Sequence, residues 1–274
     1  MGKRLGNVLL GLVFVGGVAL FSYPTVSNWL NDRYSNSVIG NYRESVDNLS
    51  DEEIEKKKEA AKAYNETLTN DREFIPYGDE EESTLDILDV GEILGYIEIP
   101  KIDASLPIYE GTSEAVLQKG VGHLKNTSLP IGGKGTHAAL SAHRGLPSAK
   151  LFTDLDKLEE GDYFYLHVLD ETLAYEVDQI LIIEPYISHE LDIDKEEDYV
   201  TLITCTPYGI NSHRMLVRGT RVPYAEKTAD ELDEVYQVEP EVNWYIVVCV
   251  LSCLTEVILI SILVRRLVII RKRT

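Results

Sequence analysis

Two apolar stretches of the chain have basic residues on their terminal side. Residues 5–23 form an uncharged stretch behind Lys3 and Arg4, and residues 242–264 form a second one, which a basic tail at residues 265–274 follows. Each stretch is long enough to cross a bilayer as a helix. Because basic flanks remain on the cytoplasmic side of a membrane, we predict that both termini are cytoplasmic and that the middle of the chain is extracellular.

The first stretch has two interpretations, a cleaved signal peptide and a retained anchor. The segment VALFSYPTVS has no clear cleavage site of small residues, which favours a retained membrane anchor at residues 1–23. The second stretch predicts a transmembrane helix at residues 242–264, with residues 225–241 as the linker that precedes it and residues 265–274 as a cytoplasmic tail.

Residues 24–92 have the pattern of amphipathic helices. Apolar residues recur there at the three-and-four spacing of a helix face. They are Ile39, Tyr42, Val46 and Leu49. Ser50 and Glu53 form a capping-box pattern, which predicts the start of a second helix. We therefore predict a helical extension ahead of the next part of the chain.

Residues 93–224 contain short apolar runs separated by turns, among them ILGYIEIP, DYFYLHVL and YVTLITC. Regular short strands without long helices between them predict a closed or nearly closed β-barrel. The acidic loop at about 71–82 carries Pro76 and Tyr77. Such a loop either links the two parts or covers a site.

Charge excludes one class of partner. The chain has 46 acidic and 26 basic residues among 274, a formal net charge of −20. Such a surface repels nucleic acid and other anionic polymers, so we predict no nucleic-acid partner.

The chain has three cysteines, and their positions differ in kind. Cys249 and Cys253 lie in the second apolar stretch, so Cys205 is the one cysteine in the predicted extracellular part. A buried apolar role is one interpretation of such a residue. An unpaired thiol in an oxidising compartment is a liability, however, and this favours a nucleophile.

A reactive cysteine needs a cation and a base nearby. If the runs that end at Cys205 and begin at Arg214 are neighbouring strands, these two residues lie side by side. His143 ends its run just as Cys205 does, and strand ends expose reactive groups. His137 begins the same run as His143, roughly 20 Å away in an extended strand, so we predict a structural role for it.

Other chemistries lack their motifs. A metal site needs three or four closely spaced ligands, and the chain has no paired cysteines and no His-Glu-x-x-His. A serine hydrolase needs a Gly-x-Ser-x-Gly elbow, which is also missing. We therefore predict no metal and no cofactor. A membrane-anchored cysteine peptidase and a non-enzymatic adhesion module stay open as alternative functions.

The segment TLITCTPYGINSHRMLVRG resembles the sortase signature, and SAHRGLPSAKLFTDLDKLEEGD resembles the histidine segment of the same family. The similarity covers residues 93–222. The YPTVSN segment, the helical extension and the C-terminal membrane stretch resemble class C, the pilus-building sortases of Gram-positive bacteria. The resemblance implies a closed eight-stranded β-barrel with short helices, an N-terminal helical extension and two transmembrane helices.

The resemblance also implies roles. Cys205 is expected to attack an LPXTG-like sorting signal between Thr and Gly and to form a thioacyl enzyme. His143 is expected to act as general acid and base, and Arg214 to hold the substrate and its oxyanion. Thr204 and Thr206 are expected to contact substrate. The acceptor implied is a lysine amine of a pilin subunit, and cell-wall attachment of surface proteins with an LPXTG-like motif is the alternative.

Class C sortases usually carry a lid with an Asp-Pro-aromatic motif over the active site. This chain has Ile75, Pro76 and Tyr77 there, so the aromatic residue is present and the aspartate is not. We expect Pro76 and Tyr77 to form a weakly latched lid, with Tyr77 as the plug near Cys205.

Overall fold

The computed structural model describes residues 2–70, 85–88, 90–185, 189–224 and 255. The predicted lid residues Pro76 and Tyr77 lie outside the described residues. So do the predicted linker, the cytoplasmic tail and, apart from residue 255, the second membrane helix.

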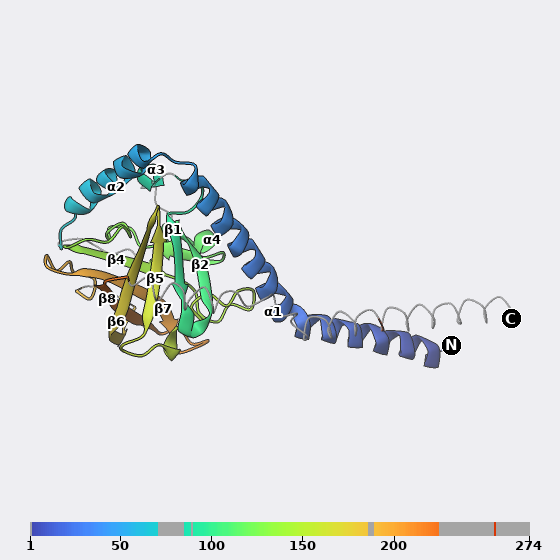
Figure 1. Ribbon diagram of the computed structural model, residues 1–274. Helices are drawn as coiled ribbons and strands as arrows, with labels where there is room; N and C mark the ends of the chain where they lie inside the picture. The colour runs from blue at the N-terminus through green and yellow to red at the C-terminus, as the bar shows by residue number, and fades with distance from the viewer. Residues whose placement is uncertain (1, 71–84, 89, 186–188, 225–254, 256–274) are drawn as a thin grey trace.

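The centre of the molecule is a closed β-barrel, as the sequence predicts (Figure 1). Its strands follow the order β1-β2-β3-β4-β7-β8-β6-β5, and β5 pairs with β1 to close it. The strands are β1 Gly95–Ile99, β2 Ala104–Glu110, β3 Val121–His123, β4 Thr136–Ser141, β5 Tyr163–Val168, β6 Glu171–Ile183, β7 Asp198–Thr206 and β8 His213–Val222. The β2–β3 and β4–β7 pairs are parallel, and the other pairs are antiparallel.

Aromatic and branched side chains fill the barrel. Phe164 on β5 and Tyr175 on β6 are fully buried and stack with ring centroids 5.5 Å apart. A glycine on β8 makes room for them, because a Cβ at Gly219 would lie 2.6 Å from a ring carbon of Phe164. Burying two such rings removes a large apolar area from water, so this stack is a main source of barrel stability.

One long helix carries the N-terminal region. Helix α1 runs from Gly2 to Asp47 without interruption and contains Pro24. The predicted boundary between residues 23 and 24 falls inside this helix, because a proline removes only one helical hydrogen bond and the helix continues through it. The anchor and the first part of the extension are therefore one element.

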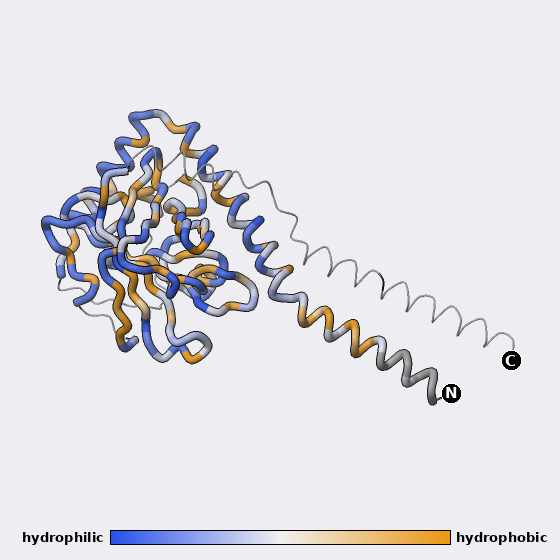
Figure 2. The backbone as a smooth tube through the Cα atoms, turned by 60° about the horizontal axis from the view of Figure 1, so that its bottom comes forward, coloured by the Kyte–Doolittle hydropathy of each residue, from blue (hydrophilic) through white to orange (hydrophobic). Residues whose placement is uncertain are grey.

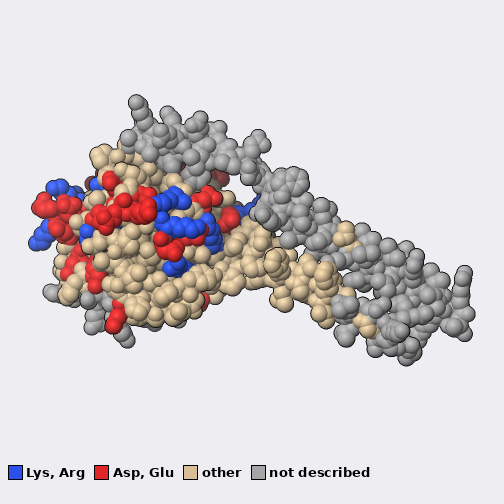
Figure 3. Space-filling view, turned by 90° about the horizontal axis from the view of Figure 1, so that it is seen from below, with Lys and Arg blue, Asp and Glu red and all other residues tan. Residues whose placement is uncertain are grey.

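Among the described residues, α1 is the one helix long and apolar enough to cross a membrane. Its N-terminal half extends away from the barrel, and the part of that half that Figure 2 colours is mostly hydrophobic. Leu20 and Phe21 are 79% and 84% exposed, which is costly in water and suits lipid. Figure 3 shows charged side chains gathered on the barrel, while the visible described part of the outer helix is uncharged.

The second half of α1 packs on the barrel with the predicted apolar face. Ile39, Tyr42 and Val46 are buried. The Tyr42 hydroxyl donates to the Leu94 carbonyl at 3.2 Å and accepts from the Leu169 amide at 2.8 Å. The hydroxyl therefore connects the helix to two segments of the barrel.

Helix α2, Asp51–Glu66, begins at the predicted capping box. The Ser50 hydroxyl accepts from the Glu53 amide at 3.3 Å, and the Ser50 amide donates to the Glu53 carboxylate at 2.9 Å. Asn65 near its end exchanges two hydrogen bonds with the backbone of Leu129, which fixes α2 to the barrel. The remaining short helices are α3 Leu85–Leu88, α4 Glu114–Leu117 and the 3-10 turns η1 Pro100–Ile102 and η2 Leu155–Lys157.

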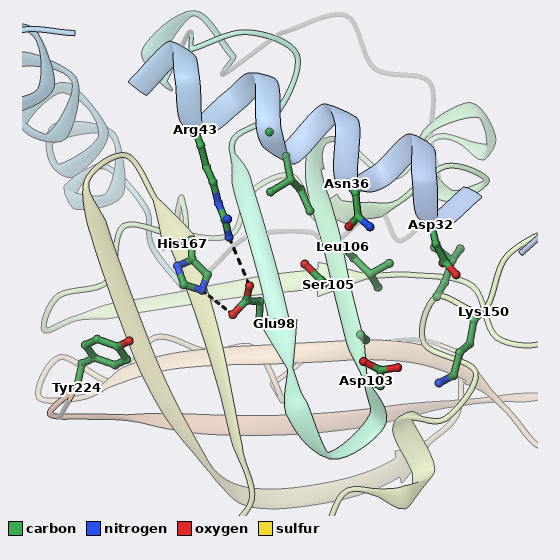
Figure 4. A pocket seen from close by; sticks show the side chains of 14 residues that line it. Asp32, Asn36, Arg43, Glu98, Asp103, Ser105, Leu106, Lys150, His167 and Tyr224 are labelled. Carbon is green, nitrogen blue, oxygen red and sulfur yellow. Dashed lines mark ion pairs between the residues drawn. The ribbon is translucent and has the colours of Figure 1, made fainter. Parts of the chain in front are cut away.

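A polar cleft of about 650 Å³ separates α1 from the barrel wall (Figure 4). Arg43 of α1 lies 3.6 Å from Glu98 of β1, and the His167 ring of β5 lies 3.2 Å from the same carboxylate. Tyr96 stacks on the His167 ring with centroids 4.3 Å apart. This cluster joins the helix to the barrel on the wall formed by β1, β2 and β5.

Candidate active site

Cys205 and Arg214 are directly opposite each other on the antiparallel strands β7 and β8. This confirms the prediction that the two residues lie side by side. Both side chains are partly exposed at the strand ends. Directly opposed residues have Cβ atoms about 5 Å apart, so the guanidinium can reach the surroundings of the thiol.

The connecting loop holds the guanidinium of Arg214. Its Nη1 atom donates to the carbonyls of Asn211 and His213 at 3.3 and 3.1 Å. Asn211 adopts a positive φ of 59° and Gly209 one of 74°, conformations that asparagine and glycine accept at low cost. The loop sequence therefore turns the backbone so that its carbonyls point at the arginine.

His143 lies at the same end of the barrel as Cys205. Strands β4 and β7 are parallel, with Ser141 paired to Ile203. The Ala142 amide continues the pairing by donating to the Ile203 carbonyl at 3.1 Å. His143 and Cys205 each come two residues after a paired residue, so neighbouring strands present them together. The three predicted residues thus lie at one end of the adjacent strands β4, β7 and β8, with His143 two residues beyond the end of β4.

The two threonines that flank Cys205 are buried. The Thr204 hydroxyl donates to the Ala142 carbonyl at 2.8 Å, next to His143. The Thr206 hydroxyl accepts from Arg144 at 3.2 Å. Both side chains therefore connect the cysteine strand to the histidine segment. Their predicted contact with substrate stays a prediction.

A carboxylate lies next to His143. Nε2 of His143 is buried and makes no hydrogen bond with the described residues. This nitrogen is 3.4 Å from Oε2 of Glu114 on α4. Gln118 donates to the other oxygen of Glu114 at 2.9 Å. This hydrogen bond, followed by the nearby imidazole, lowers the pKa of Glu114 below its ordinary value.

The other buried histidines have structural surroundings. His137 contacts the Asp192 carbonyl through Nδ1 at 2.9 Å and the Thr201 hydroxyl through Nε2 at 2.8 Å, which joins two barrel strands to the loop before β7. Burial lowers the pKa of His123, so this ring is neutral near pH 7. In the described ranges, no group of three or more His, Cys, Asp or Glu side chains is placed to hold a metal ion.

Comparison with known proteins agrees with this geometry. A family model described as "Sortase domain" matches residues 97–222. The crystal structure of sortase C-1 from Streptococcus pneumoniae is 47% identical, covers 68% of this chain and 98% of its own, and superposes with a TM-score of 0.66. A crystal structure of sortase C1 from Streptococcus agalactiae is 49% identical, covers 71% of this chain and 99% of its own, and superposes with a TM-score of 0.67. The chain belongs to the sortase family, in class C. It is therefore a cysteine transpeptidase.

Curated sortases of other kinds are more distant. Sortase D of Bacillus subtilis is 33% identical over 137 residues, which are 49% of this chain and 66% of that protein. Sortase A of Bacillus anthracis is 27% identical over 220 residues, which are 80% of this chain and 96% of that protein. The similarity to these sortases is lower than that to the class C structures.

Sequence reasoning did not single out Glu114 of this sortase. The segment SEAVLQ offered a weak signal, because Ser113 can cap a helix, Glu114 follows it, and Gln118 comes one turn later. Nothing in the sequence indicated that the carboxylate approaches His143, which is 29 positions away along the chain.

Proposed function

We propose that this sortase cleaves an LPXTG-like sorting signal between Thr and Gly and transfers the acyl group to a lysine amine of a pilin subunit. The observation that carries the proposal is the placement of Cys205, His143 and Arg214 at one end of three adjacent strands. Similar solved structures include one described as a pilus-related sortase C of Group B Streptococcus, at 43% identity and a TM-score of 0.64. That description is the support for a pilin partner.

In the first half-reaction, the Cys205 sulfur attacks the carbonyl carbon of the signal threonine. Arg214 stabilises the negative charge that forms on the carbonyl oxygen, and the loop carbonyls keep its guanidinium in place. The bond to the glycine nitrogen then breaks. His143 gives its proton to the departing amine, and a thioester on Cys205 is the product.

In the second half-reaction, a lysine amine attacks the thioester carbonyl. His143 takes a proton from the attacking amine, and the carbon–sulfur bond breaks to return the thiolate. The product is an isopeptide bond between two subunits. Repetition with further subunits extends the polymer, whereas attack by water would end it as a free acid.

The membrane orientation belongs to this proposal. Helix α1 anchors the protein, the barrel lies outside the cell, and both termini lie in the cytoplasm. Pro76 and Tyr77, outside the described residues, form the proposed lid, with the tyrosine as the plug over Cys205. Substrates held at the same cell surface would meet the barrel there.

The test uses the full chain in detergent micelles, incubated with an LPXTG peptide and either a lysine peptide from a pilin or an amine from cell-wall peptide. Mass spectrometry identifies the products. We expect a thioacyl enzyme and an isopeptide product with the lysine peptide, both lost in Cys205→Ala. Cys249→Ala is the matched control and should keep activity.

Each other outcome decides between alternatives. Transfer only to the cell-wall amine would favour attachment of surface proteins to the wall. Free acid alone, with no gain from either amine, would favour the peptidase. An adhesion module would form no thioacyl enzyme at all.

A further inference from the structure

We infer that Glu114 is a positioning residue for His143: its carboxylate orients the imidazole through Nε2 and leaves Nδ1 to carry the proton exchanged in catalysis. The inference rests on the proposed function for its role in transpeptidation. Its structural part, the orientation and tautomer of the ring, can be tested without any substrate.

The first support is the isolation of Nε2. This atom is buried and has no hydrogen-bond partner among the described residues, and the carboxylate 3.4 Å away is the charged group paired with it. An imidazole N–H that cannot reach water is stabilised by an acceptor. Catalytic hydrogen bonds are often long in the absence of substrate and shorten when it binds. A small movement of either side chain would bring the pair to hydrogen-bond distance.

The second support is the way Glu114 is held. The Ser113 hydroxyl accepts from the Val116 amide at 3.4 Å and caps the short helix α4. Leu117 is buried and packs against β3, where a Cβ at Gly122 would lie 3.0 Å from its methyl group. Gln118 then binds the carboxylate itself at 2.9 Å. The side chain is 67% exposed, yet its backbone and one oxygen are fixed.

The third support is chemical. When His143 passes a proton to the leaving amine, the ring must keep one nitrogen turned toward that amine. A carboxylate at Nε2 would hold the ring in this orientation. In the described chain, the polar and charged groups at this end of the barrel include Glu114 from α4, the Cys205 thiol from β7 and the Arg214 guanidinium from β8. On the following turn, Arg144 pairs with Asp156. Glu114 is the negatively charged group that lies beside Nε2.

The kinetic test compares Glu114→Gln with Glu176→Gln, which removes one negative charge from β6, where Glu176 accepts from Tyr163. The ion pair of Glu114 with His143 is exposed on the carboxylate side, and such pairs contribute little free energy. We therefore expect Glu114→Gln to lower kcat by about fivefold with little change in KM. Glu114→Asp should restore part of the rate, and Glu176→Gln should match the wild type.

The second test measures the ¹⁵N chemical shifts of the His143 ring by NMR in Cys205→Ala protein, with and without Glu114→Gln. We expect the neutral ring to carry its proton on Nε2 when Glu114 is present, and to become a mixture of tautomers when glutamine replaces it. A ring protonated on Nδ1 in the presence of Glu114 would overturn the inference.

The two proposals fail separately. If the wild type forms no thioacyl enzyme, the proposed function is wrong, and the NMR result still decides the orientation of the ring. If the wild type is active and Glu114→Gln has the same kcat, the positioning role is wrong while the transpeptidase proposal stands.

Discussion

Two histidine–glutamate pairs lie in different parts of this molecule. Nε2 of His143 is 3.4 Å from Glu114 at the candidate active site, and Nε2 of His167 is 3.2 Å from Glu98 on the barrel wall under α1. The side chain of Glu98 is 12% exposed, whereas that of Glu114 is 67% exposed. The same two residue types therefore occupy a closed and an open environment.

The difference lies in what the second ring nitrogen contacts. Nδ1 of His167 is 3.1 Å from the Thr172 hydroxyl, and Tyr96 covers the ring face (Figure 4 shows the ring beside Glu98). Within the described residues, no hydrogen bond reaches Nδ1 of His143. Nε2 of both rings lacks a hydrogen bond among the described residues, so the two rings differ at Nδ1. A ring with a carboxylate beside one nitrogen and a hydroxyl at the other fixes a structure, while a ring contacted on one side keeps the other nitrogen for proton transfer.

The largest expected effect is a difference in activity between replacing His143 and replacing His167. His143→Ala should lower kcat/KM by at least about 100-fold, because the reaction loses its general acid and base. His167→Ala should leave the kcat/KM of the folded enzyme unchanged. Steady-state transfer of an LPXTG peptide to a lysine acceptor measures both, and an equal loss in the two variants would remove the distinction.

The next effect separates the two carboxylates by stability. Glu98→Gln should lower the free energy of unfolding by about 1.5 kcal/mol, because the carboxylate, whose side chain is 12% exposed, loses its ion pair with Arg43. Glu114→Gln is expected to unfold at nearly the same urea concentration as the wild type. Urea denaturation followed by circular dichroism provides the comparison, and a greater loss in Glu114→Gln would contradict it.

Salt gives a smaller contrast. The Debye length is about 3 Å at 1 M salt, so an exposed pair is screened and a buried one much less. The ratio of wild-type to Glu114→Gln kcat should therefore approach one in 1 M NaCl. The stability difference between wild type and Glu98→Gln should persist there. A salt-independent kcat ratio would mean that the active-site pair is shielded from solvent.

The smallest effect concerns pH. Because the pKa of Glu114 is lowered in the folded protein, its stabilising contribution is present above the ordinary glutamate range, near pH 4.3, and is lost as pH falls through the lowered value. The small Tm difference between wild type and Glu114→Gln should thus persist at pH 5 and vanish only in more acidic solution. Scanning calorimetry from pH 3 to 7 measures it; a difference already lost at pH 5 would contradict the direction of the shift.

Local patterns predicted the parts of this protein that depend on neighbours in sequence. The Ser50 capping box and the buried face of Ile39, Tyr42 and Val46 follow from helical spacing. The barrel follows from short strands and turns. The position of Arg214 opposite a cysteine follows from the length of one loop.

The features that were missed depend on contacts distant in sequence. Glu114 reaches His143 because β3 and β4 pair and place α4 beside the histidine segment. Glu98 and His167 meet only because β5 closes the barrel on β1. No local spacing encodes these meetings.

The continuous helix α1 also determines how the barrel is held. At 1.5 Å per residue, the part after residue 23 is about 36 Å long, and it is fixed to the barrel domain along most of that length, from the hydrogen bond of Ser27 with Ser148 to the buried Val46. A flexible tether would let the catalytic end sweep a wide volume above the lipid. A helix packed along the barrel wall instead holds the end that carries Cys205 in one orientation relative to the outer part of α1.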